Sequence, residues 1–334
     1  LSAMTIGIGA IGPNAGLAVF RTLALAERIG TGAIGGYAVF AAIDRTGTLH
    51  RAETQRGGTR TLFTFAETTG VEPPDEIATA PYAAVMSSGP DRPAPLMQFL
   101  PGNGSVGLVT GHRLPNAGGR DGRALNVAVL DVMRQGQSAE QSLRAVLDAE
   151  PDADAGMIAL GPDRGIAMLN SQRVERRPDL GSSLLRSAGD AAIAILHNAI
   201  WPAGTLAPLL AEAGLEMMTA TRLPAGRVEV RAGTPVLLGA SDCVIVDERN
   251  VVLRVETTDS RIVTGIHNCA AIYVGARVIR GGDVLGVTLE EPNTMVENGR
   301  IVSLSGQSHF RIGYARTTKQ DGGLHVHPLD AGDP

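Results

Sequence analysis

The chain has 334 residues, of which 44% are hydrophobic and 19% are charged, a composition that excludes an intrinsically disordered protein. A formal net charge of −5 argues against a nucleic acid as partner, and an aromatic content of 3% leaves few rings to stack on bases. No apolar run reaches the roughly 18 residues of a membrane helix. We therefore expect a cytoplasmic protein with no membrane and no nucleic-acid partner, and the low charge predicts a homo-oligomer.

The amino-terminal region begins with two apolar runs. Residues 5–10 and 15–20 flank the turn signal Gly-Pro-Asn and are predicted to form a β-hairpin. Residues 21–29 suit a short helix. We interpret the three residues before Met4 as foreign to the natural chain, and we expect no signal peptide because no basic segment precedes the apolar run.

The segment that follows is predicted to be rich in strands. Apolar runs bounded by glycine, proline and aspartate indicate strands at about 35–43, 48–54, 83–89 and 106–111, and a helix near 59–69.

The clearest helical pattern lies between residues 122 and 149. Residues 122–135 place their apolar side chains on one face, and Ser138 is predicted to cap a second helix that follows directly. Paired strands are predicted at 155–161 and 165–171.

Two further apolar helices are predicted, at 182–200 and 205–218, before the pattern changes. From about residue 222 the sequence reads as short strands separated by glycine and aspartate turns. We therefore predict three parts: a first domain of residues 5–200, a mainly β domain of residues 201–316, and a flexible tail of residues 317–334.

A dinucleotide site is one interpretation of the first strand, because Gly7, Gly9 and Gly12 match the pattern GxGxxG. Such a site requires a full buried strand before the first glycine and a helix that starts at the third. Only two residues separate Met4 from Gly7, so an NAD(P)-dependent oxidoreductase is kept as an alternative rather than as the leading function.

Thr5 offers a different chemistry. After removal of Met4 its hydroxyl would be a nucleophile and its own α-amine would be the base. The amine suits that role because its unperturbed pKa of about 7.7–8.0 leaves a neutral fraction near pH 7.

The order of predicted elements, with strands, then two helices, then a strand pair, resembles the αββα sandwich of the N-terminal-nucleophile (Ntn) hydrolases. The segments TIGIGAIGPNAGLAVF, GTGAIGGYAVF and LNVAVLDVMRQGQSAEQSLRAVLDAEPDADAGMIAL also resemble a bacterial branch of that superfamily with no assigned activity, over about residues 5–177. The resemblance implies an α+β fold, an αββα four-layer Ntn-hydrolase-like sandwich with a C-terminal mainly β portion. It also implies that Thr5 is catalytic.

Polar residues gather in the glycine-rich segment 107–126, between a predicted strand and a predicted helix. Polar groups at such strand ends commonly line pockets. We expect a substrate to be bound there by four side chains: His112, Arg113, Asn116 and Asp121. Backbone amides at Gly35 and Gly36 are predicted to hold the oxyanion, since glycine permits close approach of the backbone.

The remaining cysteine and histidine residues do not indicate a metal site. His267 and Cys269 stand two apart on a predicted strand and so share one face, and a buried free cysteine is ordinary core. We expect no metal and no cofactor.

The sequence thus favours an amide or acyl hydrolase that acts on a small molecule through Thr5. Besides the oxidoreductase, a non-catalytic ligand-binding or assembly protein with the same fold stays open as an alternative.

Overall fold

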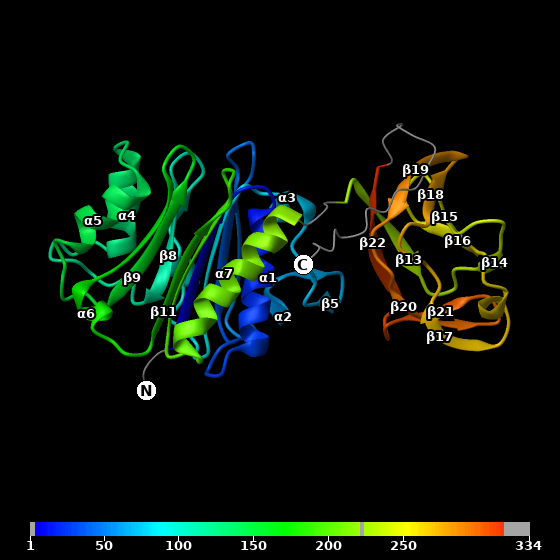
Figure 1. The fold of residues 1–334 in the computed structure, drawn as a ribbon, viewed down its shortest axis with the longest axis horizontal. Coiled ribbons are helices and arrows are strands. Elements are labelled where there is room, and N and C mark those ends of the chain that lie inside the picture. The colour runs from blue at the N-terminus through cyan, green and yellow to red at the C-terminus, as the bar shows by residue number, and fades with distance from the viewer. Residues whose placement is uncertain (1–3, 221–223, 317–334) are drawn as a thin grey trace, which may run out of the picture. The chain divides into compact units, whose positions relative to one another are not determined.

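A computed structural model describes residues 4–220 and 224–316 of the chain (Figure 1). The chain divides into two compact units, residues 1–221 (unit 1) and 222–334 (unit 2). The sequence placed this boundary at 200/201. The structure moves it because helix α7 (Ala203–Ala220) packs on strands β11 and β12 and on helix α1, all within unit 1. The predicted flexible tail, 317–334, lies outside the described residues.

Unit 1 contains a six-stranded sheet in which every neighbouring pair is antiparallel. In spatial order its strands are β11 (Leu180–Arg186), β12 (Ala192–Asn198), β1 (Thr5–Ile11), β6 (Tyr82–Ser88), β2 (Ala38–Ile43) and β3 (Leu49–Thr54). The four central strands are largely apolar on both faces, so the sheet is covered on both sides.

Two helices, α1 (Ala15–Ile29) and α7, lie side by side on one face of this sheet (Figure 1). Residues 15–20 therefore do not form the predicted second strand of a hairpin. All six of these residues are buried, and this uniform burial hides the helical period from the sequence. The chain turns from β1 into α1 at Asn14, whose backbone is left-handed with φ 59°.

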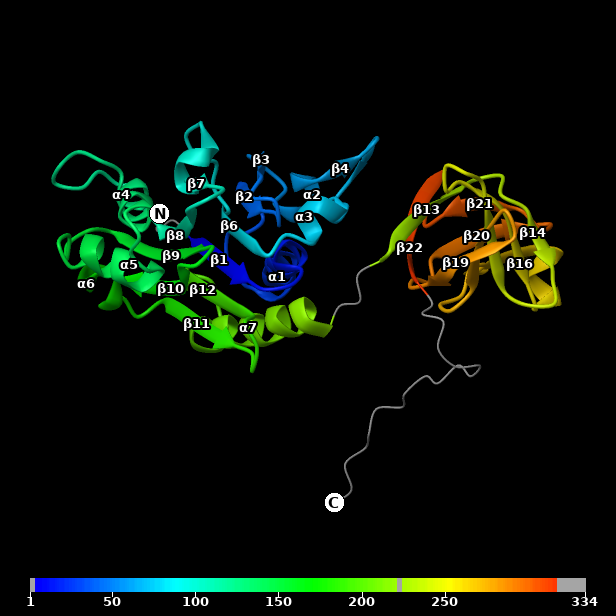
Figure 2. The ribbon, with the colours of Figure 1, turned by 90° about the horizontal axis from the view of Figure 1, so that it is seen from above.

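The second sheet of unit 1 has four strands, in the order β10 (Gly165–Asn170), β9 (Ala155–Gly161), β8 (Gly107–Arg113) and β7 (Gly102–Asn103). Helices α4 (Leu125–Arg134) and α5 (Ala139–Leu147) cover its outer face (Figure 2). The predicted cap at Ser138 is confirmed: its hydroxyl accepts from the amide of Gln141, whose side chain accepts from the amide of Ser138.

The two sheets face each other across an apolar core that includes Met86, Leu108, Ile158 and Leu196. Short elements complete the unit: α2 (Thr59–Leu62), β4 (Thr64–Phe65), β5 (Thr68–Thr69), α3 (Asp75–Ala78), the 3-10 helix η1 (Leu96–Phe99) and α6 (Gln172–Glu175). The predicted helix at 59–69 is thus a single turn followed by a small hairpin.

The predicted fold class is wrong. Strands hold 40% of the described residues and helices hold 23%, and the strands are spread over several sheets. The protein is therefore mostly β and is not the αββα four-layer sandwich that the resemblance implied. Part of the error is local: residues 182–200, predicted as a helix, belong to β11 and β12 and to the turn between them. Continuous apolar runs buried on both faces do not distinguish a strand from a helix.

Unit 2 is built of strands and one 3-10 helix, η2 (Ser260–Val263), among its described residues (Figure 2). A seven-stranded sheet contains β13 (Gly226–Arg231), β22 (His309–Ala315), β19 (Asp283–Thr288), β18 (Arg277–Arg280), β15 (Cys243–Val246), β16 (Val252–Thr257) and β14 (Val236–Leu238). A three-stranded sheet contains β17 (Ile266–Ala270), β20 (Asn293–Glu297) and β21 (Ile301–Leu304). The prediction of a mainly β segment after residue 222 is confirmed for the described part.

Within the ranges 4–220 and 224–316, no helix is both long enough and apolar enough to cross a membrane.

Candidate functional site

A row of polar residues crosses one end of the six-stranded sheet. Thr5 is paired with Asn198 on one side and with Ser88 on the other, and the amide of Ser88 donates to the carbonyl of Tyr37 at 3.2 Å. These residues occupy four adjacent strand positions, in the order Asn198, Thr5, Ser88, Tyr37. All four are fully buried. The row stands out because the other residues of the neighbouring strands β1, β2 and β6 are mostly apolar or glycine.

The side chains of this row face the second sheet. Along β1, Ile6 and Ile8 pack with the core beneath α1 and α7, so Thr5 must point to the opposite face. The same alternation applies to β12, where Ile195 lies beneath the helices and Leu196 lies between the sheets. The sequence therefore places the Thr5 hydroxyl at the polar end of the intersheet core.

The Thr5 hydroxyl is held by two short hydrogen bonds. It donates to Oδ1 of Asn198 at 2.6 Å and accepts from the backbone amide of Arg113 at 2.6 Å. The first bond comes from the neighbouring strand and the second from the opposite sheet. The oxygen is therefore fixed between the two sheets, with its proton directed towards Asn198.

Arg113 bonds Thr5 through its backbone amide, and its side chain holds the residue in place through an ion pair. It ends β8 with φ 65°, a left-handed conformation that costs energy for a residue with a side chain. Its guanidinium makes a bidentate pair with Asp154, Nε to Oδ1 at 2.9 Å and Nη2 to Oδ2 at 2.6 Å. The Arg113 hydrogen bond holds the pKa of Asp154 below its usual range. This ion pair keeps the strand end in the geometry that aims the amide at Thr5.

His112 lies next to this amide and is fully buried between the sheets. Its Nε2 is 2.8 Å from Oδ1 of Asn170, on the other side of Gly156. Burial lowers the pKa of His112 to about 4, although the nearby amides of Asn170 and Asn198 oppose the shift. At neutral pH the ring is therefore uncharged, with one nitrogen that donates a hydrogen bond and one that accepts.

Gly156 is required for this contact. A Cβ at this position would lie 2.1 Å from Oδ1 of Asn170 and 2.2 Å from Nε2 of His112. The absence of a side chain thus opens the space in which the two polar groups meet.

His197 is a second buried histidine, but it lies on the other face of β12, over Gly181 and near the start of α7. Neither ring nitrogen has a hydrogen-bond partner in the described structure. Burial lowers its pKa to about 4. It is close to the site without contacting Thr5.

The predicted oxyanion donors are otherwise engaged. The amide of Gly36 donates to the carbonyl of Ser88 at 3.0 Å, so it supports the loop before β2. Gly35, with φ 78°, lies against the side chain of Glu27. The amide of Gly36 is thus already bonded within unit 1 in this conformation, and the oxyanion role of Gly35 and Gly36 stays a prediction.

The polar loop 107–126 divides into two groups. Arg113 bonds Thr5 through its amide, and His112, the residue before it, meets Asn170, as described above. Asn116 instead donates to Oε1 of Gln98 at 2.9 Å, on the rim of the same region. Asp121 binds the amide and guanidinium of Arg123 on the surface and closes a turn, so the structure gives it no part in the site. Its predicted role in substrate binding stays a prediction.

Three residues of the site were not predicted: Ser88, Asn170 and Asn198. Each is the last residue of its strand. A polar residue that ends a buried apolar strand is the signal that would have found Ser88 and Asn170. Asn198 lies in the segment 182–200 that the sequence predicted as a helix, so it was not identified as the end of a strand.

The glycines of the GxGxxG pattern do not form the expected phosphate loop. A dinucleotide site belongs to a parallel βαβ unit, whereas β1 is antiparallel to both of its neighbours. Gly7 faces the second sheet at very close range: a Cβ there would lie 2.5 Å from the carbonyl oxygen of Gly111. The glycine pattern therefore serves sheet packing.

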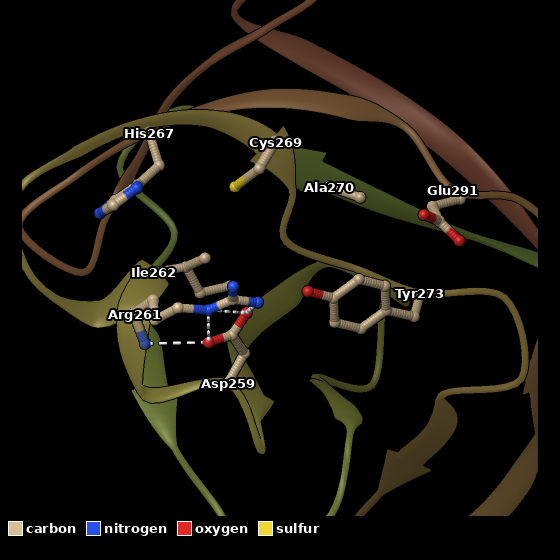
Figure 3. A pocket seen from close by; sticks show the side chains of 8 residues that line it. All are labelled: Asp259, Arg261, Ile262, His267, Cys269, Ala270, Tyr273 and Glu291. Carbon is tan, nitrogen blue, oxygen red and sulfur yellow. Dashed lines mark hydrogen bonds and ion pairs between the residues drawn. The ribbon is translucent and has the colours of Figure 1, made fainter.

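Unit 2 carries a separate open pocket of about 390 Å³ (Figure 3). It is lined by Asp259, Arg261, Ile262, His267, Cys269, Ala270, Tyr273 and Glu291. Arg261 is already paired with Asp259, and burial raises the pKa of the Cys269 thiol, which disfavours the thiolate. Over the described ranges no three histidine, cysteine, aspartate or glutamate side chains are grouped to hold a metal ion. This pocket offers less chemistry than the polar end of the two sheets.

Comparison with known families gives two matches. Residues 233–309, within unit 2, match a domain of unknown function, DUF7259. A search of curated proteins gives no match. Residues 5–227, which include Thr5 and every partner described for it, match a domain of unknown function, DUF6963. Because this match covers more than half of the 334 residues, the chain belongs to the DUF6963 family.

Proposed function

We propose that unit 1 is an amide or related acyl hydrolase for a small molecule, with Thr5 as an N-terminal nucleophile. The observation that supports it best is the hydroxyl of Thr5, fully buried yet held at 2.6 Å by both Asn198 and the amide of Arg113. A structural threonine at the start of a strand needs no such pair of contacts from two sheets.

The reaction requires a free α-amine on Thr5. With Met4 attached, the Thr5 nitrogen is an amide and cannot accept a proton. In a chain that begins at Thr5, the amine takes the hydroxyl proton while Oγ1 forms a bond to the substrate carbonyl. The carbon–nitrogen bond of the substrate then breaks, and the proton passes to the leaving amine. Attack by water releases the acid and restores the hydroxyl.

The other residues of the site position these groups. Asn198 is too weak a base to take the proton, so it orients the hydroxyl. Arg113 fixes the same oxygen from the opposite sheet, and neutral His112 braces the end of that sheet through Asn170. The close contact of Gly7 with Gly111 leaves no space for a substrate beyond Thr5, which favours a small substrate.

Covalent labelling tests the proposal. Two forms of the full chain, one beginning at Thr5 and one retaining Met4, are treated with a β-lactone that acylates nucleophilic hydroxyls, and peptide mass mapping locates the adduct. We expect an adduct on Thr5 only in the first form, retained by Thr5→Ser and lost in Thr5→Ala. Loss of a nucleophile removes several powers of ten in rate, each about 1.4 kcal/mol of barrier.

Thr22→Ala is the matched control, because Thr22 is an equally buried threonine whose hydroxyl has no partner among the described residues. Its labelling should equal that of the unaltered chain. Equal labelling of the two forms, or an adduct that persists in Thr5→Ala, would reject Thr5 as the nucleophile and favour a ligand-binding protein.

A further inference from the structure

Arg92 places a guanidinium with two unbonded N–H groups near the site. It lies on the loop between β6 and η1, whose residues 93–95 are exposed, but its guanidinium reaches inward. The guanidinium carbon lies 5.8 Å from the ring centre of Tyr37 and 5.9 Å from that of Phe99. Its Nε and Nη2 atoms are buried and have no hydrogen-bond partner within the described ranges. These two nitrogens have lost water without gaining an acceptor, although the charge also lies against the two aromatic rings.

The side of the guanidinium that carries Nε and Nη2 binds carboxylates elsewhere in this chain. Arg113 uses Nε and Nη2 to hold the two oxygens of Asp154, at 2.9 and 2.6 Å. Arg177 holds Asp179 in the same way, at 2.9 and 2.7 Å. This parallel pair of N–H groups matches the two oxygens of a carboxylate. In Arg92 the same two nitrogens, Nε and Nη2, have no acceptor among the described residues.

Tyr37 adds a second unused donor beside Arg92. Its side chain is fully buried, and its hydroxyl has no partner among the described residues. Burial raises its pKa, so the hydroxyl stays protonated and can donate. Two neighbouring side chains therefore present donors to the same region and no acceptor meets them.

The position of Tyr37 relates this region to Thr5. Tyr37, Ser88 and Thr5 stand in line on three neighbouring strands, and their side chains face the second sheet. Adjacent strands are about 4.8 Å apart, so Tyr37 and Thr5 are separated by ~10 Å along this line. A group bound by Arg92 and Tyr37 would lie to the side of the nucleophile, across the strands.

We infer that Arg92 and Tyr37 bind a carboxylate of the substrate, so that the substrate class is an amide whose acyl chain ends in a second carboxylate. This inference rests on the proposed hydrolase function. A single negative charge fits because the neighbouring cation, Arg56, is already paired with Asp91 at 2.7 Å. A phosphate dianion would need a second free cation.

Binding of adipate, a six-carbon dicarboxylate, tests the inference. Isothermal titration of the full chain carrying Thr5→Ala avoids turnover. We expect adipate to bind at least tenfold more tightly than its neutral diamide and than inorganic phosphate. Arg92→Gln should weaken adipate binding at least tenfold, and Tyr37→Phe severalfold. Arg56→Gln, which changes an exposed arginine whose guanidinium is already paired with Asp91, should leave the affinity unchanged.

The stability of Arg92→Met provides a second measurement, because this variant keeps the packing on Tyr37 and Phe99 but removes the charge. Without ligand its melting temperature should equal or exceed that of the unaltered chain, since an unpaired buried charge is removed. A fall of several degrees would show that the guanidinium serves packing and would overturn the inference. Adipate binding that survives Arg92→Gln, or that phosphate equals, would overturn it as well.

The two proposals fail separately. Adipate binding through Arg92 without β-lactone labelling of Thr5 would reject the hydrolase and leave a carboxylate-binding protein. Labelling of Thr5 without adipate binding would keep the hydrolase and reject this substrate class.

Discussion

Thr5 and Thr22 are both fully buried in unit 1, but only Thr5 has its hydroxyl bonded to both sheets. Thr5→Val keeps the shape and removes two buried hydrogen bonds, so we expect unfolding free energy to fall by about 1–3 kcal/mol. Thr22→Val removes a hydroxyl that has no partner in the described structure and should be neutral or stabilising. Urea denaturation of both variants measures the difference, and equal effects would show that the Thr5 contacts contribute nothing.

The two buried histidines make stability depend on pH. Burial lowers the pKa of His112 and of His197 from 6.5 to about 4. Between these values the unfolded chain binds protons that the folded chain does not, so stability falls as pH decreases from about 6.5 to 4. Each histidine contributes at most about 3 kcal/mol to this loss.

Urea denaturation at several pH values measures this slope. Glu27, whose pKa is raised by burial, acts in the opposite direction, since its stabilising effect is present at low pH and is lost as pH rises above its usual value of 4.5. His112→Asn should reduce the slope by about one proton. A slope that His112→Asn leaves intact would contradict the assignment.

At the scale of single residues, the sequence could place His112 and Arg113 near Thr5 only through the resemblance and the polarity of their loop. Asn198 could not be found, because its contact with Thr5 depends on which strand pairs with β1, and that pairing spans 193 residues. The hydrogen bond of the Gly36 amide could not be found from the sequence for a related reason. Its amide is committed to Ser88, a hydrogen bond that only the assembled sheet reveals.

At the scale of secondary-structure elements, a substitution in β9 can test how tightly Gly156 packs against His112 and Asn170. Gly156→Ala would place a methyl group within 2.2 Å of polar atoms of both His112 and Asn170. Overpacking of this kind costs about 1–3 kcal/mol, and the displaced His112 should also reduce Thr5 labelling. Gly204→Ala is the control: it lies in α7 with no atom within 4 Å of the added carbon, and it should stabilise the helix by up to about 1 kcal/mol. Thermal unfolding compares the two variants.

The elements that the sequence predicted well are those with strong local signals. The capping box at Ser138 sets the start of α5, and the polar and apolar faces of α4 define that helix. The elements predicted wrongly are α1, β11 and β12. Residues 15–20 of α1 and all of β12 are buried without interruption, so the spacing of their apolar residues does not distinguish a helix from a strand. The fold class failed with them, because sheet number and strand content depend on these assignments.

At the scale of the whole molecule, each unit has its own apolar core. Three clusters of buried residues lie in unit 1 and one lies in unit 2. We expect a chain that begins at Thr5 and ends at residue 221 to unfold cooperatively and to keep its β-lactone labelling. Calorimetry and mass mapping of this fragment, beside the full chain, test the expectation. Loss of labelling in a folded fragment would show that unit 2 contributes to the reaction.

The contact of Gly7 with Gly111 determines how a ligand can be oriented. Two residues beyond Thr5 along β1, a Cβ at Gly7 would lie 2.5 Å from the carbonyl oxygen of Gly111, so main chain closes the space between the two sheets at that level. A long molecule cannot thread between the sheets along the strand direction. We expect a ligand at Thr5 to lie across the strands instead, over Ser88 and towards Tyr37. The length of the ligand would then be limited by the number of strands that it crosses and not by the length of the strands.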